Sequence, residues 1–205
     1  MAALRIFRSV LSRGVDSRMA VRFTHGSNPD VNVVPLPEVS RVLTASSETI
    51  AARVQKSASP FHRSLNIVPT GGISLPDFTP DLVHLHWVGS NALSLHEIED
   101  IPVPVVWTLH DSWPFAGADH HPLYPSDTRF VTGYRRNNRV HSSRVDIDGW
   151  VWKRKFATWK RRFHLVAPSR WMAEQAQRSK LMGNQPTVTI PNPVDIEALT
   201  SCAGD

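Results

Sequence analysis

Residues 80–121 read PDLVHLHWVGSNALSLHEIEDIPVPVVWTLHDSWPFAGADHH, and this stretch decides the fold. Its pattern predicts a strand over residues 82–87, a short helix, and then a nearly continuous apolar strand over residues 103–109, as in a sheet buried on both faces. His110 and Asp111 follow the second strand directly. Because ligands of parallel α/β sheets bind outside the carboxyl ends of the strands, these polar residues predict a functional site.

The rest of the chain continues this alternation of strands and helices. Residues 3–11 have a helical apolar spacing that ends near Gly14, and residues 19–23 alternate as a strand does. The alternation predicts an α/β fold with a Rossmann-like doubly wound parallel sheet. We further expect a capping box at Ser94 and Glu97, a loop over 25–37, an irregular segment over 61–78 and a long loop over 119–145. The other expected elements are a helix over 39–54 with Val39, Val42, Leu43, Ile50, Ala51 and Val54 on one side, a helix over about 147–162, a strand over 164–167, a helix capped by Ser169, and a strand over 187–190.

Size and composition are those of a globular protein. A chain of 205 residues with 41% hydrophobic and 20% charged residues suits one domain, or half of a two-domain enzyme. No apolar run approaches the roughly 18 residues of a membrane span. The single cysteine, Cys202, cannot form an internal disulfide and fits a reducing compartment. The Arg-rich N-terminus has the composition of a transit peptide, but its helix–strand pattern favours a folded unit.

The positive charge is concentrated in one part of the chain. The net charge is +5, and Lys and Arg gather between Arg135 and Arg170, where only Asp146 and Asp148 oppose them. Such a patch suits phosphate groups, whether of nucleic acid, anionic lipid or a diphosphate ligand. A solvated helix face explains the same charges without any ligand. The charge pattern alone leaves both interpretations open.

The predicted helix near Trp152 carries an aromatic stripe. Basic residues such as Lys153 and Lys155 lie largely off this stripe. A basic amphipathic helix with aromatic residues can lie in a membrane interface. Core packing is the commoner use of such a stripe, and we favour it. The stripe consists of Trp152, Phe156, Trp159 and Phe163.

Histidines near the two predicted strands suggest two kinds of site. His84 and His86 share one side of a strand, and with His110 they could bind a metal that lowers the pKa of a bound water. We favour core or supporting roles, because nothing in the sequence places the other ligands within reach of the first two. His110, with Asp111 beside it, is more specific. It could act as a general base or stabilise charge, or it could simply tie down its loop.

Four strings of residues together resemble glycosyltransferase family 4, near its branch for colanic acid and related polysaccharides. They are VHLHW, VVWTLHDSWPFAG, LVAPSRWMAEQAQRS and TIPNPVD, and the resemblance spans nearly the whole chain with gaps. Any one string is weak, but the combination is specific. The resemblance implies one half of a GT-B architecture, in which two Rossmann-like domains face each other across a cleft.

The resemblance also implies an activity and a set of site residues. Members transfer a sugar from a nucleotide sugar to an acceptor with retention of configuration, without a metal or other cofactor, and the N-terminal domain mainly receives the acceptor. By resemblance, His110 reaches the transferred sugar and Asp111 stands beside it as a second catalytic residue. The remaining expected residues are Trp87, Trp113, His120, Ser169 and Arg170 for the acceptor or sugar, and Asn192 and Asp195 in an interdomain turn where Pro193 replaces the usual Gly. Trp113 could instead wedge its loop into the core, together with Phe115.

The expected partners follow from the same resemblance. They are a nucleotide sugar and a glycan or lipid-linked acceptor of polysaccharide biosynthesis, with no nucleic acid. We expect a cytoplasmic location, with peripheral contact to the inner face of the plasma membrane through the helix near Trp152.

Besides Pro193, the sequence departs from the family pattern in three places. Residues 1–190 resemble an acceptor-side domain that lacks the family's first strand and Gly-rich loop, so we expect unpaired strand edges. Residues 191–205 resemble the start of an interdomain linker, without the donor domain that follows it in relatives. The loop after FAG has no cysteine, unlike that of close relatives. We therefore expect little or no sugar transfer by this chain alone, and the alternatives are a metal-dependent hydrolase or a non-catalytic half-domain that binds a partner chain.

Overall fold

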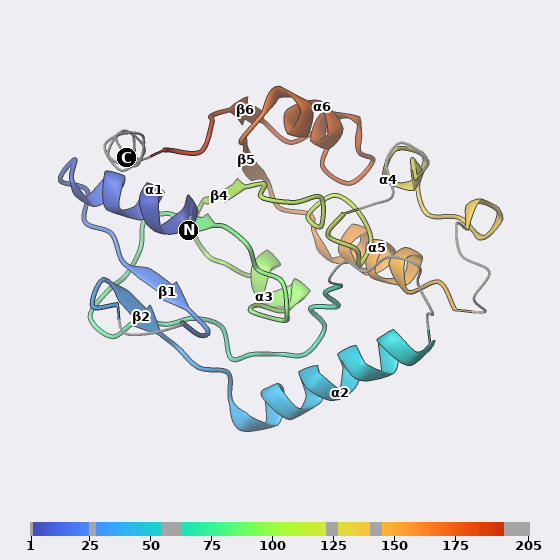
Figure 1. The fold of residues 1–205 in the computed structure, drawn as a ribbon, viewed down its shortest axis with the longest axis horizontal. Coiled ribbons are helices and arrows are strands. Elements are labelled where there is room, and N and C mark those ends of the chain that lie inside the picture. The colour runs from blue at the N-terminus through green and yellow to red at the C-terminus, as the bar shows by residue number, and fades with distance from the viewer. Residues whose placement is uncertain (1, 25–27, 55–62, 122–126, 140–144, 195–205) are drawn as a thin grey trace, which may run out of the picture.

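The computed structural model describes residues 2–24, 28–54, 63–121, 127–139 and 145–194, and helices and strands alternate along them (Figure 1). The α-helices are α1 (Ala2–Leu11), α2 (Glu38–Val54), α3 (Leu95–Glu99), α4 (Arg129–Thr132), α5 (Ile147–Thr158) and α6 (Arg170–Arg178), and η1 (Arg136–Asn138) is a short 3-10 helix. The strands are β1 (Met19–Val21), β2 (Val31–Val33), β3 (Val83–Leu85), β4 (Val105–Thr108), β5 (Phe163–Ala167) and β6 (Thr187–Thr189).

The strands form two parallel sheets, which confirms the predicted α/β class. One sheet pairs β1 with β2, and the other has the order β3-β4-β5-β6. Within the larger sheet, Leu85 lies opposite Trp107, which in turn lies opposite Leu165. A helix stands in every connection between neighbouring strands of this sheet. Sequential parallel strands joined by helices are the arrangement of a Rossmann-like half-sheet.

The main core lies against one face of the larger sheet. Alternate residues of a strand share a face, and Leu85, Trp107 and Leu165 are all buried in one cluster. The same cluster contains Ile98 from α3, Met172 from α6 and Trp152 from α5. These three helices therefore cover the same face, and they fix the strands whose carboxyl ends carry the candidate site.

A buried polar cluster joins β1 to the larger sheet. The predicted capping box is present, since Glu97 Oε2 accepts from the Ser94 amide at 2.7 Å and Ser94 Oγ accepts from the Glu97 amide at 3.2 Å. The Thr70 amide also donates to Glu97 at 2.7 Å. Burial by itself raises the pKa of Glu97, but the hydrogen bonds from Ser94 and Thr70 outweigh it and lower the pKa to about 2. Arg22, just after β1, donates to Thr70 Oγ1 at 2.6 Å and to the Ala92 carbonyl at 2.7 Å.

Among the strands of the described segments, β1 and β3 each have one edge without a neighbouring strand. The Val34 amide donates to the Val21 carbonyl at 2.8 Å, so the alternation of a parallel ladder turns the N–H and C=O of Ala20 away from β2. On the larger sheet, the Val83 amide donates to the Pro104 carbonyl, just before β4, at 3.0 Å. His84 therefore turns its backbone N–H and C=O away from β4. Both strands therefore present backbone donors and acceptors on their outer edges.

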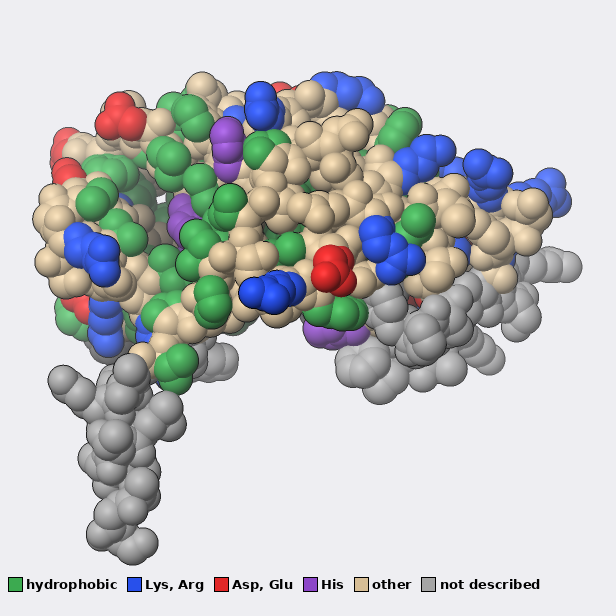
Figure 2. Space-filling view, turned by 90° about the horizontal axis from the view of Figure 1, so that it is seen from above, with side chains coloured by type: hydrophobic (Ala, Val, Ile, Leu, Met, Phe, Trp, Pro, Cys, Tyr) green, Lys and Arg blue, Asp and Glu red, His purple; other side chains and the backbone are tan. Residues whose placement is uncertain are grey.

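Contacts at both ends of β1 hold it near β3. The Arg18 guanidinium lies 5.3 Å from the centre of the Phe78 ring, ahead of β3, and Arg22 binds the Ala92 carbonyl beyond β3. Figure 2 shows an opening into the molecule on this side, with histidine side chains next to it. The two sheets are thus joined by side chains, without a backbone ladder between β1 and β3.

Three segments differ from the sequence prediction. β2 lies within residues 25–37, which were predicted to be a loop, because three residues are too few to show a strand period. α4 and η1 lie within residues 119–145, also predicted to be a loop, and they place Phe130 and Tyr134 in the core. α5 is shorter than predicted and ends at Thr158.

α2 forms where predicted, but most of its apolar side faces outward. Val39 and Leu43 are exposed, whereas Ser40 and Thr44 are buried. The Ser40 hydroxyl donates to the Pro69 carbonyl at 2.7 Å, so a polar contact sets which side of the helix meets the protein. The apolar spacing therefore predicted the helix, but Ala51 is the one buried residue among the described side chains of its apolar side.

Candidate active site

The candidate site lies at the carboxyl ends of β3 and β4. His86 directly follows β3, and His110 lies just beyond β4. Their rings stack with centroids 5.2 Å apart, and His86 Nδ1 lies 2.9 Å from His110 Nε2. The His84 ring lies 4.3 Å from the His86 ring, and its Nε2 lies 2.8 Å from Thr108 Oγ1. The three histidines of the sequence hypothesis therefore form one cluster.

Burial keeps these imidazoles neutral. Burial, together with the nearby His84 and His110, lowers the pKa of His86 to about 3. Burial also lowers the pKa of His84, with His110 adding to the effect, and it lowers the pKa of His110, where the Asp111 carboxylate opposes it. The contact between His86 and His110 is then a hydrogen bond between two neutral rings, in which one nitrogen donates and the other accepts.

The cluster fits a hydrogen-bonded pair better than a metal site. Zn–N bonds of about 2.0–2.1 Å hold two nitrogens of a tetrahedral site about 3.3 Å apart, whereas the facing nitrogens of His86 and His110 are 2.9 Å apart. His84 Nε2 is directed to Thr108. Within the described segments, no group of three or more His, Cys, Asp or Glu is placed to hold a metal. The geometry gives no support to a metal-dependent hydrolase.

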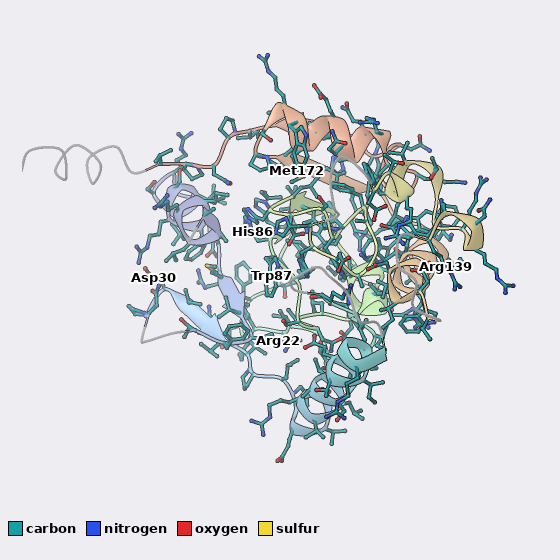
Figure 3. All side chains as sticks on the ribbon, turned by 45° about the vertical axis from the view of Figure 1, so that its right-hand side comes forward. Arg22, Asp30, His86, Trp87, Arg139 and Met172 are labelled. Carbon is teal, nitrogen blue, oxygen red and sulfur yellow. The ribbon has the colours of Figure 1, made fainter. Side chains whose placement is uncertain are left out.

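His110 lines a small pocket at this edge of the sheet. The cavity volume is about 10 Å³, which is room for about one water molecule. Trp87 lines the same pocket with 43% of its surface exposed, and Figure 3 shows it near His86. A sugar ring is too large for this cavity. A sugar that contacts His110 would therefore lie at the mouth of the pocket, beside Trp87.

The neutral His86 predicts a loss of stability in mild acid. The unfolded chain takes up a proton below the ordinary histidine pKa of 6.5, whereas folded His86 does so only near pH 3. The free energy of unfolding should therefore fall as pH drops from about 6.5 toward 3, and His86→Gln should flatten this dependence. Urea unfolding at several pH values measures it, with His96→Gln, an exposed histidine of α3, as the control. An NMR titration of His86 with a midpoint near 6.5 would contradict the prediction.

Asp111 begins a buried polar chain beneath the site loop. Its Oδ2 lies 2.5 Å from His120 Nδ1, and His120 Nε2 lies 2.7 Å from Ser64 Oγ. The order resembles a nucleophilic Ser-His-Asp arrangement, but Ser64 is fully buried and its Oγ accepts from the Ser90 amide at 2.8 Å. The chain of contacts therefore orients the loop. Ser64 was missed by the sequence analysis because 56 residues separate it from His120.

Two residues expected to bind sugar are buried in this loop. Trp113 is 1% exposed and His120 is 3% exposed, and their rings stack with centroids 6.2 Å apart. The Trp113 indole donates to the Ser64 carbonyl at 2.9 Å, and Phe115 is buried as well. Trp113 and Phe115 thus wedge the loop into the core, which is the second of their two predicted uses.

Lys155, from α5, fixes the same loop from the core. Its Nζ donates to the carbonyls of Trp113 at 2.5 Å, Gly117 at 2.7 Å and Ala116 at 3.3 Å, and it lies 3.7 Å from the centre of the Trp113 ring. Burial lowers the pKa of Lys155. The sequence analysis placed this lysine off the buried stripe, which is wrong. Its spacing of four from the buried Trp159 is the signal that marks it.

The aromatic stripe near Trp152 packs mainly into the core, as favoured from the sequence. Trp152 and Trp159 are buried, and Phe163 belongs to β5. Phe156 is 44% exposed and stacks on Trp152 with ring centroids 5.2 Å apart. None of the described helices has the length and apolar character needed to cross a bilayer. Any membrane contact of α5 would use its outer face, because Trp152 itself points inward.

The remaining expected residues follow β5 and β6. Ser169 caps α6 by accepting from the Met172 amide at 3.2 Å, and Arg170 is exposed beside it. Asn192 follows β6, and its Oδ1 is buried without a hydrogen bond from the described residues. Asp195 lies outside the described residues. Because all strands of this sheet are parallel, Ser169 and Asn192 stand at the same edge as the histidine pair.

A family model described as Glycosyltransferase Family 4 matches residues 13–198 of the chain. The matched range contains all six strands and the loop that carries the histidine pair. No curated protein and no solved structure matches the chain.

Proposed function

The chain belongs to glycosyltransferase family 4, and from this premise we propose that it forms the acceptor side of a retaining enzyme. The family binds a sugar donor and an acceptor. In the proposed reaction the sugar passes from a nucleotide sugar to a glycan or lipid-linked acceptor of polysaccharide biosynthesis. The position of His110 is the observation that supports this most, because it stands at the carboxyl end of β4 and is held neutral beside His86.

His110 would orient the transferred sugar in this proposal. A neutral imidazole offers one donor and one acceptor, and its bond to His86 leaves the other ring nitrogen for a sugar hydroxyl. The bond from the anomeric carbon to the nucleoside diphosphate breaks, a bond to the acceptor oxygen forms, and the hydroxyl proton leaves with the diphosphate. Asp111 would act as a positioning residue, because its carboxylate holds His120 and the loop. The proposal includes no metal or other cofactor.

The location proposed is the cytoplasmic face of the plasma membrane, without nucleic acid as a partner. The outer face of α5 supports a peripheral contact. The Arg154 guanidinium lies 5.1 Å from the centre of the Trp150 ring, and Lys160 Nζ lies 5.4 Å from the centre of the Phe156 ring. Both aromatic rings are partly exposed. Aromatic and basic side chains together suit the boundary between lipid head groups and acyl chains.

Transfer of a labelled sugar tests the proposed activity. The protein would be incubated with a panel of labelled nucleotide sugars and a lipid extract, and label in the glycan or lipid product would be counted. With a donor-binding chain present, we expect transfer with retention, seen by NMR of the new anomeric centre. We expect His110→Ala to lower kcat/KM by about 100-fold, the usual cost of misplacing a reacting group. His96→Ala, in an exposed position on α3, serves as the control.

Two outcomes would count against the proposal. Equal transfer by His110→Ala and the unmodified protein would remove His110 from the reaction. An absence of transfer with every donor, even with a donor-binding chain present, would favour the non-catalytic half-domain. Co-purification of a second, donor-binding chain would identify that partner.

A further inference from the structure

A second pocket lies between α2 and α5, away from His110. Its volume is about 670 Å³, within the roughly 300–1,000 Å³ of small-molecule sites. Figure 1 shows α5 next to the C-terminal end of α2, and residues of both helices line the pocket. None of its lining residues lines the pocket beside His110. It is therefore a separate candidate for a ligand.

The walls of this pocket are largely apolar. Ala51, Leu65 and Ile147 belong to one small buried cluster and line the pocket together. Ile50 and Trp150 line it as well, and they are 59% and 43% exposed. An alkyl chain that covers such side chains removes apolar surface from water, which favours binding.

Basic side chains surround these apolar walls. Arg135, Arg136 and Lys153 line the pocket and are exposed, and Arg139 lines it at 3.9 Å from Asp146. Asp146 is the single carboxylate among the described lining residues, and it already caps α5. Figure 2 shows Lys and Arg side chains gathered at this end of the molecule, and Figure 3 labels Arg139 there. The lining therefore has a clear excess of positive charge.

We propose that this pocket binds a lipid phosphate. The alkyl chain covers the apolar walls, and the phosphate pairs with Arg135, Arg136 and Lys153, because charge-assisted bonds to phosphate are the strongest that these side chains make. Exposed aliphatic walls favour a lipid over nucleic acid, whose backbone has no chain to cover them. The inference rests on the proposed function in one respect, since the lipid phosphate would be the carrier part of the acceptor.

Binding of dodecyl phosphate, followed by isothermal titration calorimetry below its micelle concentration, tests the inference. We expect the double variant Arg135→Gln, Arg136→Gln to bind at least about tenfold more weakly. Arg162→Gln with Arg178→Gln, two exposed cations outside the pocket, should leave the affinity unchanged. Both double variants remove two positive charges. A loss of affinity in the first variant alone therefore indicates a specific site, whereas equal losses indicate non-specific electrostatic attraction.

The apolar half of the site needs its own comparison. Ile50→Asn should weaken binding of dodecyl phosphate, whereas Val42→Asn, an exposed position of the same helix outside the pocket, should not. Binding of dodecanol or of inorganic phosphate as tightly as dodecyl phosphate would overturn the inference. Equal losses of affinity in the two double variants that remove cations would overturn it as well. Displacement of dodecyl phosphate by a single-stranded oligonucleotide would favour nucleic acid instead.

The pocket and the enzyme activity can fail separately. If the protein binds dodecyl phosphate through Arg135 and Arg136 but transfers no sugar, the site stands and the proposed activity falls. If sugar is transferred and the Arg135→Gln, Arg136→Gln variant keeps the KM for a lipid-linked acceptor, the site plays no part in acceptor binding.

Discussion

Replacing Lys155 by Met is expected to lower the free energy of unfolding by about 3 kcal/mol or more, because each buried polar group left unsatisfied costs about 1–3 kcal/mol. Lys155 Nζ donates hydrogen bonds to the carbonyls of Trp113, Ala116 and Gly117, all within the loop that follows β4. Methionine has a similar length, so the variant removes these bonds without opening a large cavity. The loss should also loosen Trp113, whose ring the ammonium covers at 3.7 Å.

Urea unfolding of Lys155→Met against Lys153→Met measures the effect. Lys153 lies on the same helix and is exposed, so its replacement should leave the unfolding midpoint within the usual range of surface substitutions. Trp fluorescence would report the loosened loop. A Lys155→Met protein of unchanged or higher stability would show that burying the ammonium costs as much as its three bonds return.

Replacing Arg129 by Met is expected to lower the free energy of unfolding by about 3–5 kcal/mol, the usual cost of removing one partner from a buried ion pair. The Arg129 guanidinium holds Asp127 with two bonds of 2.9 Å and 2.7 Å, and it lies 3.5 Å from Asp146 and 3.6 Å from Asp148. Burial lowers the pKa of Arg129, but Asp127, with Tyr134 and Asp148, raises it by more in total, so the guanidinium stays charged. Without it, several carboxylates face one another in a largely buried site.

The loss in free energy of unfolding caused by Arg129→Met should become smaller as the pH falls, because protonation of the carboxylates removes the uncompensated negative charge of the variant. Unfolding at pH 7 and pH 4 measures this change. Arg136→Met provides the matched control, since Arg136 is exposed in the neighbouring η1. A deficit that stays constant between the two pH values would mean that lost packing, rather than charge, destabilises the variant.

The elements that carry the site could be predicted because short-range pattern decides them. The apolar run before His110 forms β4, and the pair of Ser94 and Glu97 begins α3, since both depend on contacts within a few residues. The buried side of α2 could not be predicted in the same way. It depends on Pro69, which the Ser40 hydroxyl binds from 29 residues away.

The site itself could be predicted only in part. Spacing put His84 and His86 on one face, and the end of β4 supplied His110. The 2.9 Å contact between two of these rings depends on the register of β3 against β4, which no local pattern specifies. Burial of His120 likewise depends on Ser64, far away in the chain.

Because side chains alone join β1 to β3 in the described part of the chain, the smaller sheet should unfold locally more easily than the larger sheet. Each sheet is held by a backbone ladder, but the two sheets are joined by side-chain contacts such as that of Arg22 with Ala92. Segments tied down in this way open locally at free energies well below that of global unfolding. We therefore expect amide hydrogens of β1 and β2 to exchange with deuterated solvent before those of β4, which has a neighbouring strand on each side. Such an order would make the N-terminal part of the chain a separate cooperative unit.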